Sequence, residues 1–318
     1  RFQTQVNCPE LQSDDVLTLA LDYKKRLWTG TARGGLSVFT NPYTQSNKLK
    51  GKALFPGNII SLQIDSKNNL WIGQGSGEGL KIIDLKHYKY SEKINLHHYK
   101  KSPSKPNSLS DNSIFCIYED NLEDIWIGTF GGGINYTSKR AKKFHKIDEY
   151  KGEEKILSSN LINCFLEDGN LLWIGTESGL DCWDKKTNTF TTYINEPGNK
   201  KSLQGNSVYS LSKDIYGNLW IGTWSGGLNK FNYQSETFTH IPLGKNPINN
   251  VFAIESDSLG HIWVGTVEPT DGLYKYTIAT GETKSYYARK NDSSTISTNT
   301  INDILITQNN TVYISTFN

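Results

Sequence analysis

The chain has 318 residues, of which 36% are hydrophobic, 12% aromatic and 21% charged, with 28 glycines and no methionine. Its formal net charge of +2 is close to neutral, so we expect no nucleic-acid partner, because such domains usually carry a strongly basic face. No run reaches the roughly 18 apolar residues of a membrane-spanning helix. The chain starts at Arg1, inside a strand-like run and without a signal peptide, which predicts a piece of a larger protein.

A tetrapeptide, Trp-Ile-Gly-Thr or a close variant, recurs along the whole chain. The copies begin at Trp28, Trp71, Trp126, Trp173, Trp220 and Trp263, and a divergent seventh copy is Tyr313-Ile314-Ser315-Thr316. Successive copies are 43 to 55 residues apart, which is the period of propeller and solenoid repeats. The repeat therefore predicts the architecture before any single residue is considered.

The chain opens with Arg1–Asn7, which is similar to the last strand of a repeat, such as Thr237–Ile241. The clearest repeat has four short apolar-alternating runs: Val208–Lys213, Leu219–Thr223, Leu228–Asn232 and Thr237–Ile241. Short runs joined by tight turns predict an antiparallel four-stranded meander. The chain ends with only two such runs, Ile301–Thr307 and Thr311–Thr316.

Stacking such meanders radially buries both of their faces, so we expect an all-β fold, a seven-bladed β-propeller of four-stranded antiparallel blades. Residues 1–318 should form this single domain. The last blade should be incomplete at the C-terminus and closed by the N-terminal strand Arg1–Asn7.

The repeated residues have structural roles in this interpretation. An aspartate stands six residues before five of the tryptophans, at Asp22, Asp65, Asp120, Asp214 and Asp257, where its carboxylate can accept backbone N–H groups. In the copy with Asp168 the turn is one residue shorter. The tryptophan should be a wedge between blades, and the glycine two residues later should leave room for a neighbouring group.

The four cysteines do not predict a disulfide framework. Cys116 and Cys164 occupy the same repeat position, and equivalent positions in adjacent blades are unsuited to the ~7 Å limit of a disulfide. We interpret them as small buried residues.

The loops between the second and third strands are not dictated by the repeat, so they are where function can vary. The residues that we expect to ring the mouth of the propeller channel are Arg33, Glu78, Phe130, Glu177, Trp224, Glu268 and Asp271. Aromatic faces with a few convergent polar groups suit a sugar. Trp224 is the most interesting because it departs from the repeat, although it can also simply pack on a neighbouring loop.

Metal and catalytic motifs are weak. The six histidines show no spaced ligand motif, so we expect no metal, no cofactor and no catalytic residue. Paired carboxylates at the mouth leave glycoside cleavage open. The run Ser212–Trp220 looks like the Asp-box of sialidases with one extra residue, but the mouth loops offer only Arg33 for a substrate carboxylate.

The unit Asn-x-[Ile/Val]-x-x-[Ile/Leu]-x-x-Asp-x-x-Gly-Asn-Leu-Trp-Ile-Gly-Thr-x-x-Gly-Gly-Leu resembles the two-component regulator propeller repeat, roughly from Val16 to Thr316. The segments Ser104–Ser110 and Lys201–Asn206 resemble the linker that precedes this repeat. The resemblance implies a periplasmic ligand-sensing ectodomain of an inner-membrane hybrid histidine kinase. It also implies oligosaccharide ligands, neighbouring propeller and immunoglobulin-like domains in the same chain, and a possible homodimer.

Three functional hypotheses follow. The first is a non-enzymatic sensor domain that binds oligosaccharides. The second is a propeller enzyme acting on glycans, as a glycosidase or a lyase, the latter weakened because no histidine falls in the second-to-third-strand loops. The third is a protein-interaction scaffold like WD-repeat proteins, whose Gly-His and Trp-Asp signatures are missing here.

Overall fold

The structure is a computed structural model that describes residues 8–40, 50–90, 94–138, 144–152, 154–244, 250–267, 272–290, 292 and 294–317. The chain divides into two compact units. The first unit contains Phe2–Lys151 with Asn160–Ile162, and the second contains Gly152–Ser159 with Asn163–Asn318. The organisation as one domain stays a prediction.

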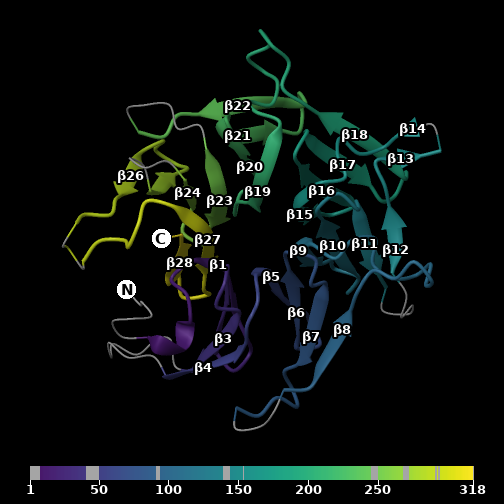
Figure 1. Cartoon of the computed structure of the whole chain (residues 1–318). Helices are drawn as coiled ribbons and strands as arrows, with labels where there is room; N and C mark the ends of the chain where they lie inside the picture. The colour runs from purple at the N-terminus through teal and green to yellow at the C-terminus, as the bar shows by residue number, and fades with distance from the viewer. Residues whose placement is uncertain are drawn as a thin grey trace. The chain divides into compact units, whose positions relative to one another are not determined.

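The first unit starts with a short 3-10 helix, η1 (Pro9–Leu11), and continues with three antiparallel meanders (Figure 1). Blade 1 consists of β1 (Val16–Leu21), β2 (Leu27–Thr31), β3 (Leu36–Thr40) and β4 (Lys50–Phe55). Blade 2 consists of β5 (Ile59–Ile64), β6 (Asn69–Gln74), β7 (Leu80–Asp84) and β8 (Leu96–Tyr99). Blade 3 consists of β9 (Ile114–Glu119), β10 (Ile125–Thr129), β11 (Ile134–Thr137) and β12 (His145–Ile147), and β13 (Tyr150–Lys151) follows it.

The second unit contains β14 (Glu154–Lys155), three further meanders and one smaller sheet. Blade 4 consists of β15 (Ile162–Asp168), whose first residue belongs to the first unit, β16 (Leu171–Thr176), β17 (Leu180–Asp184) and β18 (Thr189–Tyr193). Blade 5 consists of β19 (Ser207–Lys213), β20 (Leu219–Trp224), β21 (Gly227–Asn232) and β22 (Thr237–Ile241). Blade 6 consists of β23 (Val251–Ser256), β24 (His261–Thr266), β25 (Leu273–Thr277) and β26 (Thr283–Tyr286). The smaller sheet pairs β27 (Ile301–Ile306) with β28 (Val312–Thr316).

The fold is an all-β propeller of four-stranded antiparallel blades, but the described residues form six such blades, so the expectation of seven is wrong. The tryptophan motif marks only the second strand of a repeat, so seven copies of the motif do not establish seven complete blades. A blade also needs third and fourth strands, and β27–β28 form a sheet of only two strands among the described residues. The expected closing strand, Arg1–Asn7, lies outside the described residues.

The repeated aspartate organises the turn between the first and second strands, as predicted. In blade 5, Asp214 Oδ1 accepts the backbone N–H groups of Tyr216 and Asn218 at 2.9 Å each, and Oδ2 accepts Trp220 Nε1 at 2.8 Å. Gly217 adopts a φ of 83° there, a left-handed conformation that suits glycine. The aspartate therefore joins the turn to the core tryptophan. Asp22, Asp65, Asp120 and Asp257 accept the same indole hydrogen bond.

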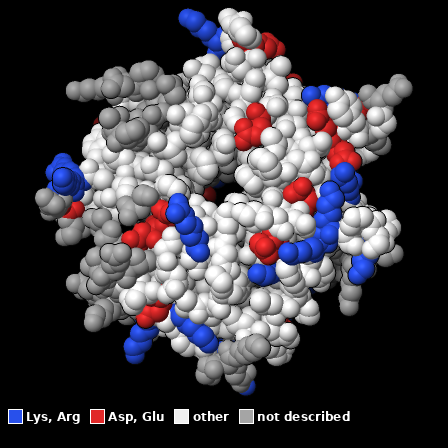
Figure 2. Space-filling model, in the orientation of Figure 1, with Lys and Arg blue, Asp and Glu red and all other residues white. Residues whose placement is uncertain are grey.

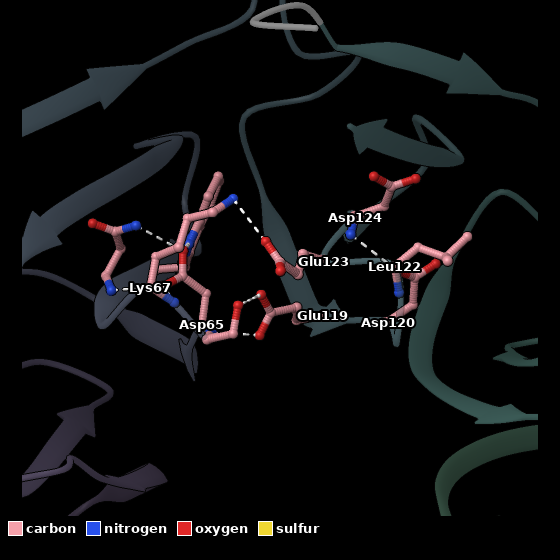
Figure 3. Close-up of polar contacts among 10 residues, drawn as sticks. Asp65, Lys67, Glu119, Asp120, Leu122, Glu123 and Asp124 are labelled. Carbon is pink, nitrogen blue, oxygen red and sulfur yellow. Dashed lines mark hydrogen bonds and ion pairs between the residues drawn. The ribbon is translucent and has the colours of Figure 1, made fainter. Parts of the chain in front are cut away.

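These turns also contact the next blade within a unit. In the first unit, Glu119 of β9 faces the turn between β5 and β6, where its carboxylate accepts the backbone N–H and the hydroxyl of Ser66 at 2.6 and 2.7 Å (Figure 3). Lys67 of this turn forms an ion pair at 3.3 Å with Glu123 of the turn between β9 and β10. Neighbouring turns thus hold each other in register.

The motif glycine receives a side chain of the following blade. A Cβ on Gly222 would lie 2.7 Å from Val251 Cγ1, and one on Gly265 would lie 2.7 Å from Ile301 Cγ2. In the first unit, Gly30 has the same relationship with Ile59. Only glycine permits this approach, so the predicted role of the glycine is confirmed.

Polar residues at the start of the third strands hold the linkers that precede each first strand. Asn229 Oδ1 accepts the backbone N–H of Gln204 at 3.1 Å in blade 5. Asp181 in blade 4 is fully buried, and it accepts hydrogen bonds from the N–H and hydroxyl of Ser158, both at 2.8 Å. Burial raises the pKa of this carboxyl above its usual value. These bonds fix the loops from which the candidate site is built.

Candidate functional site

The structure places five of the seven predicted site residues. Arg33, Glu78 and Phe130 belong to the first unit, and Glu177 and Trp224 belong to the second. Glu268 and Asp271 lie outside the described residues. Each of the five lies at the end of a second strand or in the loop that leads to the third strand, as the repeat predicts.

Trp224 is the last residue of β20 and is 41% exposed. The hairpin that follows is tight, because Ser225 has a φ of 64° and a Cβ on Gly226 would lie 1.7 Å from Gln204 O. The Ser225 N–H donates to Asn250 Oδ1 at 3.0 Å. The backbone around this exposed indole is therefore fixed by its neighbours on both sides.

The indole of Trp224 lies beside an aromatic residue that the sequence interpretation missed. Tyr209 of β19 has its ring centroid 6.1 Å from that of Trp224 and 4.6 Å from that of Phe252 in β23. Tyr209 has no partner in the register of β19 with β20, and Phe252 has none in the register of β23 with β24. Each is therefore the extra residue of a β-bulge. A bulge turns a side chain away from the alternation of the strand and is common next to functional sites. Here the two bulges leave the rings of Tyr209 and Phe252 half-buried and in contact, and Tyr209 also lies beside the exposed indole of Trp224.

Glu177 is oriented by donors from the same region. Its carboxylate accepts hydrogen bonds from Asn163 Nδ2 at 3.2 Å and from the hydroxyl of Ser207. Burial, together with the neighbouring charge and hydrogen bond of Glu177, raises the pKa of Tyr209 to about 12. Glu177, Tyr209 and Trp224 therefore form one group, which we call the aromatic–carboxylate cluster, with Phe252, Asn163 and Ser207 around it.

Phe130 in blade 3 occupies the repeat position that Trp224 occupies in blade 5. It is 55% exposed and stacks on Phe115, with centroids 5.2 Å apart and planes at 25°. Phe115 is again the bulged residue of its first strand. The same arrangement, an exposed aromatic residue over a bulged one, thus occurs once in each unit.

The charged candidates of the first unit are separate features. Arg33 is exposed after β2. Glu78 is exposed and pairs with Lys100 at 3.3 Å, while its backbone carbonyl lies 2.7 Å from His98 Nε2. On the face shown in Figure 2, acidic and basic side chains are interspersed among uncharged residues.

The bulged residues were missed because strand alternation alone assigns them no special direction. The available signal was the residue that follows the repeated Ile or Val of each first strand. That position is Leu17, Ile60, Phe115, Asn163, Tyr209, Phe252 and Asn302 in successive repeats, so it varies while the residue before it stays Ile or Val.

Two histidines of the second unit bond to nearby protein groups. His261 Nδ1 lies 2.8 Å from Asp257 Oδ2, and His240 Nε2 lies 3.0 Å from Ser202 O. No group of three or more metal-ligating side chains occurs among the described residues. The same residues contain no helix long and apolar enough to cross a membrane.

Comparison with known proteins agrees with this architecture. The sequence model of the two-component regulator propeller family matches residues 108–131, 202–225 and 246–268. A histidine kinase named P4 from Formosa agariphila is 30% identical over 275 residues, covering 70% of this chain and 19% of that protein. The chain therefore spans about a fifth of the length of this curated relative.

Solved structures share the fold. The extracellular domain of a putative hybrid two-component system from B. thetaiotaomicron superposes with a TM-score of 0.75 at 20% identity, over 100% of this chain and 40% of that one. A streptogramin B lyase superposes with a TM-score of 0.69 at 14% identity, over 96% and 91%. Identities this low indicate a common fold and leave activity open.

The repeated meanders, with their aspartate turns and tryptophan wedges, define a protein of the β-propeller class. The match of three segments to the model of the two-component regulator propeller family confirms the resemblance that the sequence motif indicated.

Proposed function

We propose that this chain is the ligand-sensing part of a membrane-bound hybrid histidine kinase and that it recognises oligosaccharides without turning them over. The similarity to a histidine kinase and to an extracellular two-component domain supports the sensor role. A periplasmic location, neighbouring propeller and immunoglobulin-like domains, and a homodimer belong to the same proposal.

The observation that carries the ligand class is the aromatic–carboxylate cluster of the second unit. Trp224 offers an exposed flat apolar face, and Glu177 offers a carboxylate held in place by Asn163 and Ser207. Sugar rings present apolar faces together with hydroxyl donors, which match such a pair. Because the hairpin after Trp224 is fixed, little ordering accompanies binding, which favours affinity.

The proposal is tested by a thermal-shift screen of neutral and acidic oligosaccharides, with titration calorimetry on each hit. Trp224→Ala should abolish the shift. Tyr216→Ala is a matched control, because Tyr216 is a 62% exposed aromatic residue in the turn at the other end of the same blade. If both variants lose the thermal shift equally, or if neither variant loses it, binding lies outside the cluster.

The lyase-like fold makes an enzyme the second candidate. Incubation of each hit with the protein, followed by chromatography of the sugar, separates the two functions. Unchanged sugar supports sensing, whereas new reducing ends or unsaturated products would show that the domain is an enzyme.

A further inference from the structure

A groove of about 370 Å³ lies in the first unit, between the linker that joins β8 to β9 and β12, the edge strand of blade 3 (Figure 1). We call it the linker groove. Its charged lining residues are all basic, namely Lys101, Lys105 and Lys146, and His145 lies among them. No acidic residue belongs to the described residues that line it. Sites for small molecules usually measure about 300–1,000 Å³, so the groove is large enough for a small ligand.

Two of the three lysines lack a compensating carboxylate. Asp148 pairs with Lys146 at 2.6 Å, and Asp111 accepts a backbone N–H group two residues further on at 2.7 Å. Neither Lys101 nor Lys105 pairs with a carboxylate in the part of the chain that the structure describes, and both side chains are exposed. An anion in the groove therefore meets two ammonium groups that have no other charged partner.

Apolar side chains form another part of the lining. Leu109 is 2% exposed and belongs to a hydrophobic core cluster, and the half-buried Phe144 packs against that cluster. The next residue, His145, stacks on Tyr136 with ring centres 4.9 Å apart and planes at 23°. The linker groove thus combines a fixed apolar surface with exposed positive charges, which suits an organic anion better than a free inorganic ion.

Hydrogen bonds hold the linker before β9 in the same way as the linker before β19 in the second unit. The Lys101 N–H donates to Asn112 Oδ1 at 2.6 Å. The Asn195 N–H donates to Asn206 Oδ1, also at 2.6 Å. The next residue of each linker donates its N–H to a serine hydroxyl six residues further on, at 2.9 and 3.0 Å. The two linkers can therefore be compared position by position.

The charges at equivalent linker positions differ. Where the first unit has Lys101, Ser102 and Lys105, the second has Asn195, Glu196 and Asn199. The carboxylate of Glu196 accepts Asn199 Nδ2 at 2.7 Å. The lysines of the second linker, Lys200 and Lys201, stand at other positions, where the first linker has Pro106 and Asn107. Two positive charges in the first unit thus replace a carboxylate and its amide partner in the second.

The fourth strands differ at the same place. Lys146 in blade 3 and His240 in blade 5 hold the same register position, opposite Asn135 and Asn229 respectively. His240 contacts its linker, because its Nε2 atom lies 3.0 Å from Ser202 O. Lys146 pairs with Asp148 instead. The first unit therefore has a basic groove where the second has a contact between strand and linker.

We propose that the linker groove binds the anionic group of a small organic ligand, a carboxylate, sulfate or phosphate. Lys101 and Lys105 neutralise the anion, and the hydrocarbon part lies on Phe144. Ser110, whose hydroxyl oxygen accepts Asn135 Nδ2 at 2.6 Å, donates its own hydrogen to the same anion. This site is independent of the proposed oligosaccharide site, because the aromatic–carboxylate cluster belongs to the second unit.

The test uses the full chain and four probes that share one ring: benzoate, phenyl sulfate, phenyl phosphate and the neutral benzyl alcohol. Saturation-transfer difference NMR gives their affinities. We expect at least one anion to bind about tenfold more tightly than benzyl alcohol, and the tightest of the three identifies the anionic group. Raising the salt concentration from about 20 mM to about 500 mM should weaken this binding severalfold, because the lysines are exposed. Equal affinity for all four probes would overturn the proposal.

Paired lysine variants locate the site. The double variant Lys101→Gln/Lys105→Gln should weaken binding of the tightest anion about tenfold. Lys200→Gln/Lys201→Gln is the matched control, since it removes the same charge from the equivalent linker of the second unit, and it should leave binding unchanged. Equal weakening in the two double variants would mean that overall charge, not the linker groove, attracts the anion, and would contradict the site.

A second substitution adds the carboxylate that the other linker carries. Ser102→Glu places it where Glu196 stands and should weaken anion binding more than tenfold, whereas the neutral Ser102→Gln should stay within about twofold of wild type. Wild-type affinity in Ser102→Glu would refute the proposal. Circular dichroism checks folding, and if Ser102→Glu does not fold, the lysine pair decides. Trp224→Ala should retain anion binding whatever happens to oligosaccharide binding, so the two proposals fail separately.

Discussion

Tyr209 and Phe252 are the bulged residues of consecutive first strands, and their ring centres lie 4.6 Å apart. A regular strand would alternate these side chains with their neighbours, whereas the bulges bring the two rings together, with Tyr209 beside Trp224. The aromatic surface of the second unit is thus made by backbone irregularity as much as by residue choice. The repeat supplies a rigid frame, and the bulged position supplies the variable side chain.

Tyr209→Phe tests the polar part of the aromatic–carboxylate cluster. The substitution keeps the ring packing but removes the hydroxyl next to Glu177. We expect the affinity for any oligosaccharide hit to fall about fivefold, the effect of about one hydrogen bond, with the melting temperature changed little. Calorimetry gives the affinity. Unaltered affinity in Tyr209→Phe, together with a loss in Trp224→Ala, would mean that stacking alone carries recognition.

Asp214→Ala should destabilise the protein more than Asp168→Ala. Asp214 is buried and joins two backbone N–H groups and the Trp220 indole, so its loss leaves several buried donors unpaired. We expect a decrease of about 3 kcal/mol in the free energy of unfolding for Asp214→Ala, and about 1 kcal/mol for the more exposed Asp168 pair with Lys213. Chemical denaturation measures both, and equal losses would refute the role of the indole bond.

Gly222→Ala should destabilise the interface between blades 5 and 6. The added methyl group would lie 2.7 Å from Val251 Cγ1, so the cost is about 1–3 kcal/mol. Val251→Ala in the same chain removes the clashing methyl groups. The double variant should therefore be more stable than the sum of the two single effects predicts, and strict additivity would show that the two residues do not compete for this space.

The raised pKa of Glu255 predicts that the stability of the protein depends on pH. Burial and, to a smaller extent, the nearby charge of Asp303 raise the pKa of its carboxyl from 4.5 to about 8. Between these pH values the unfolded chain has lost the proton and the folded chain still holds it. The free energy of unfolding therefore falls as pH rises from 4.5 to about 8, by at most about 1.4 kcal/mol per pH unit. Glu255→Gln should flatten this slope in denaturation curves, and an unchanged slope would assign it to other groups.

Much of the fold is readable from the sequence because the repeat fixes local hydrogen bonds. The Asp214 turn, the Trp220 wedge and the Gly222 contact each follow from residue type and spacing, and the structure confirms them. The blade count was wrong because a tryptophan marks one strand and not its partners. Tyr209 and Phe252 were missed because a bulge depends on how neighbouring strands pair, which no local pattern encodes.

The candidate site was only partly readable for a related reason. Trp224 stood out by breaking the repeat, and the structure shows its exposure. The turn after Asp168 is one residue shorter than in the other repeats, and Asp168 accepts a hydrogen bond from Tyr233, which is far from it in sequence.

The contact between each motif glycine and the next blade has a direction along the chain. Within the second unit, Gly175 accommodates Val208, Gly222 accommodates Val251, and Gly265 accommodates Ile301. Every blade there is completed by the blade that follows it, so stability is coupled between nearest neighbours, as in linear repeat arrays. Hydrogen exchange should then show that loosening β27 lowers protection in blade 6 first and in blade 5 only afterwards. Disturbance in this unit would travel from the C-terminal sheet backwards, one blade at a time.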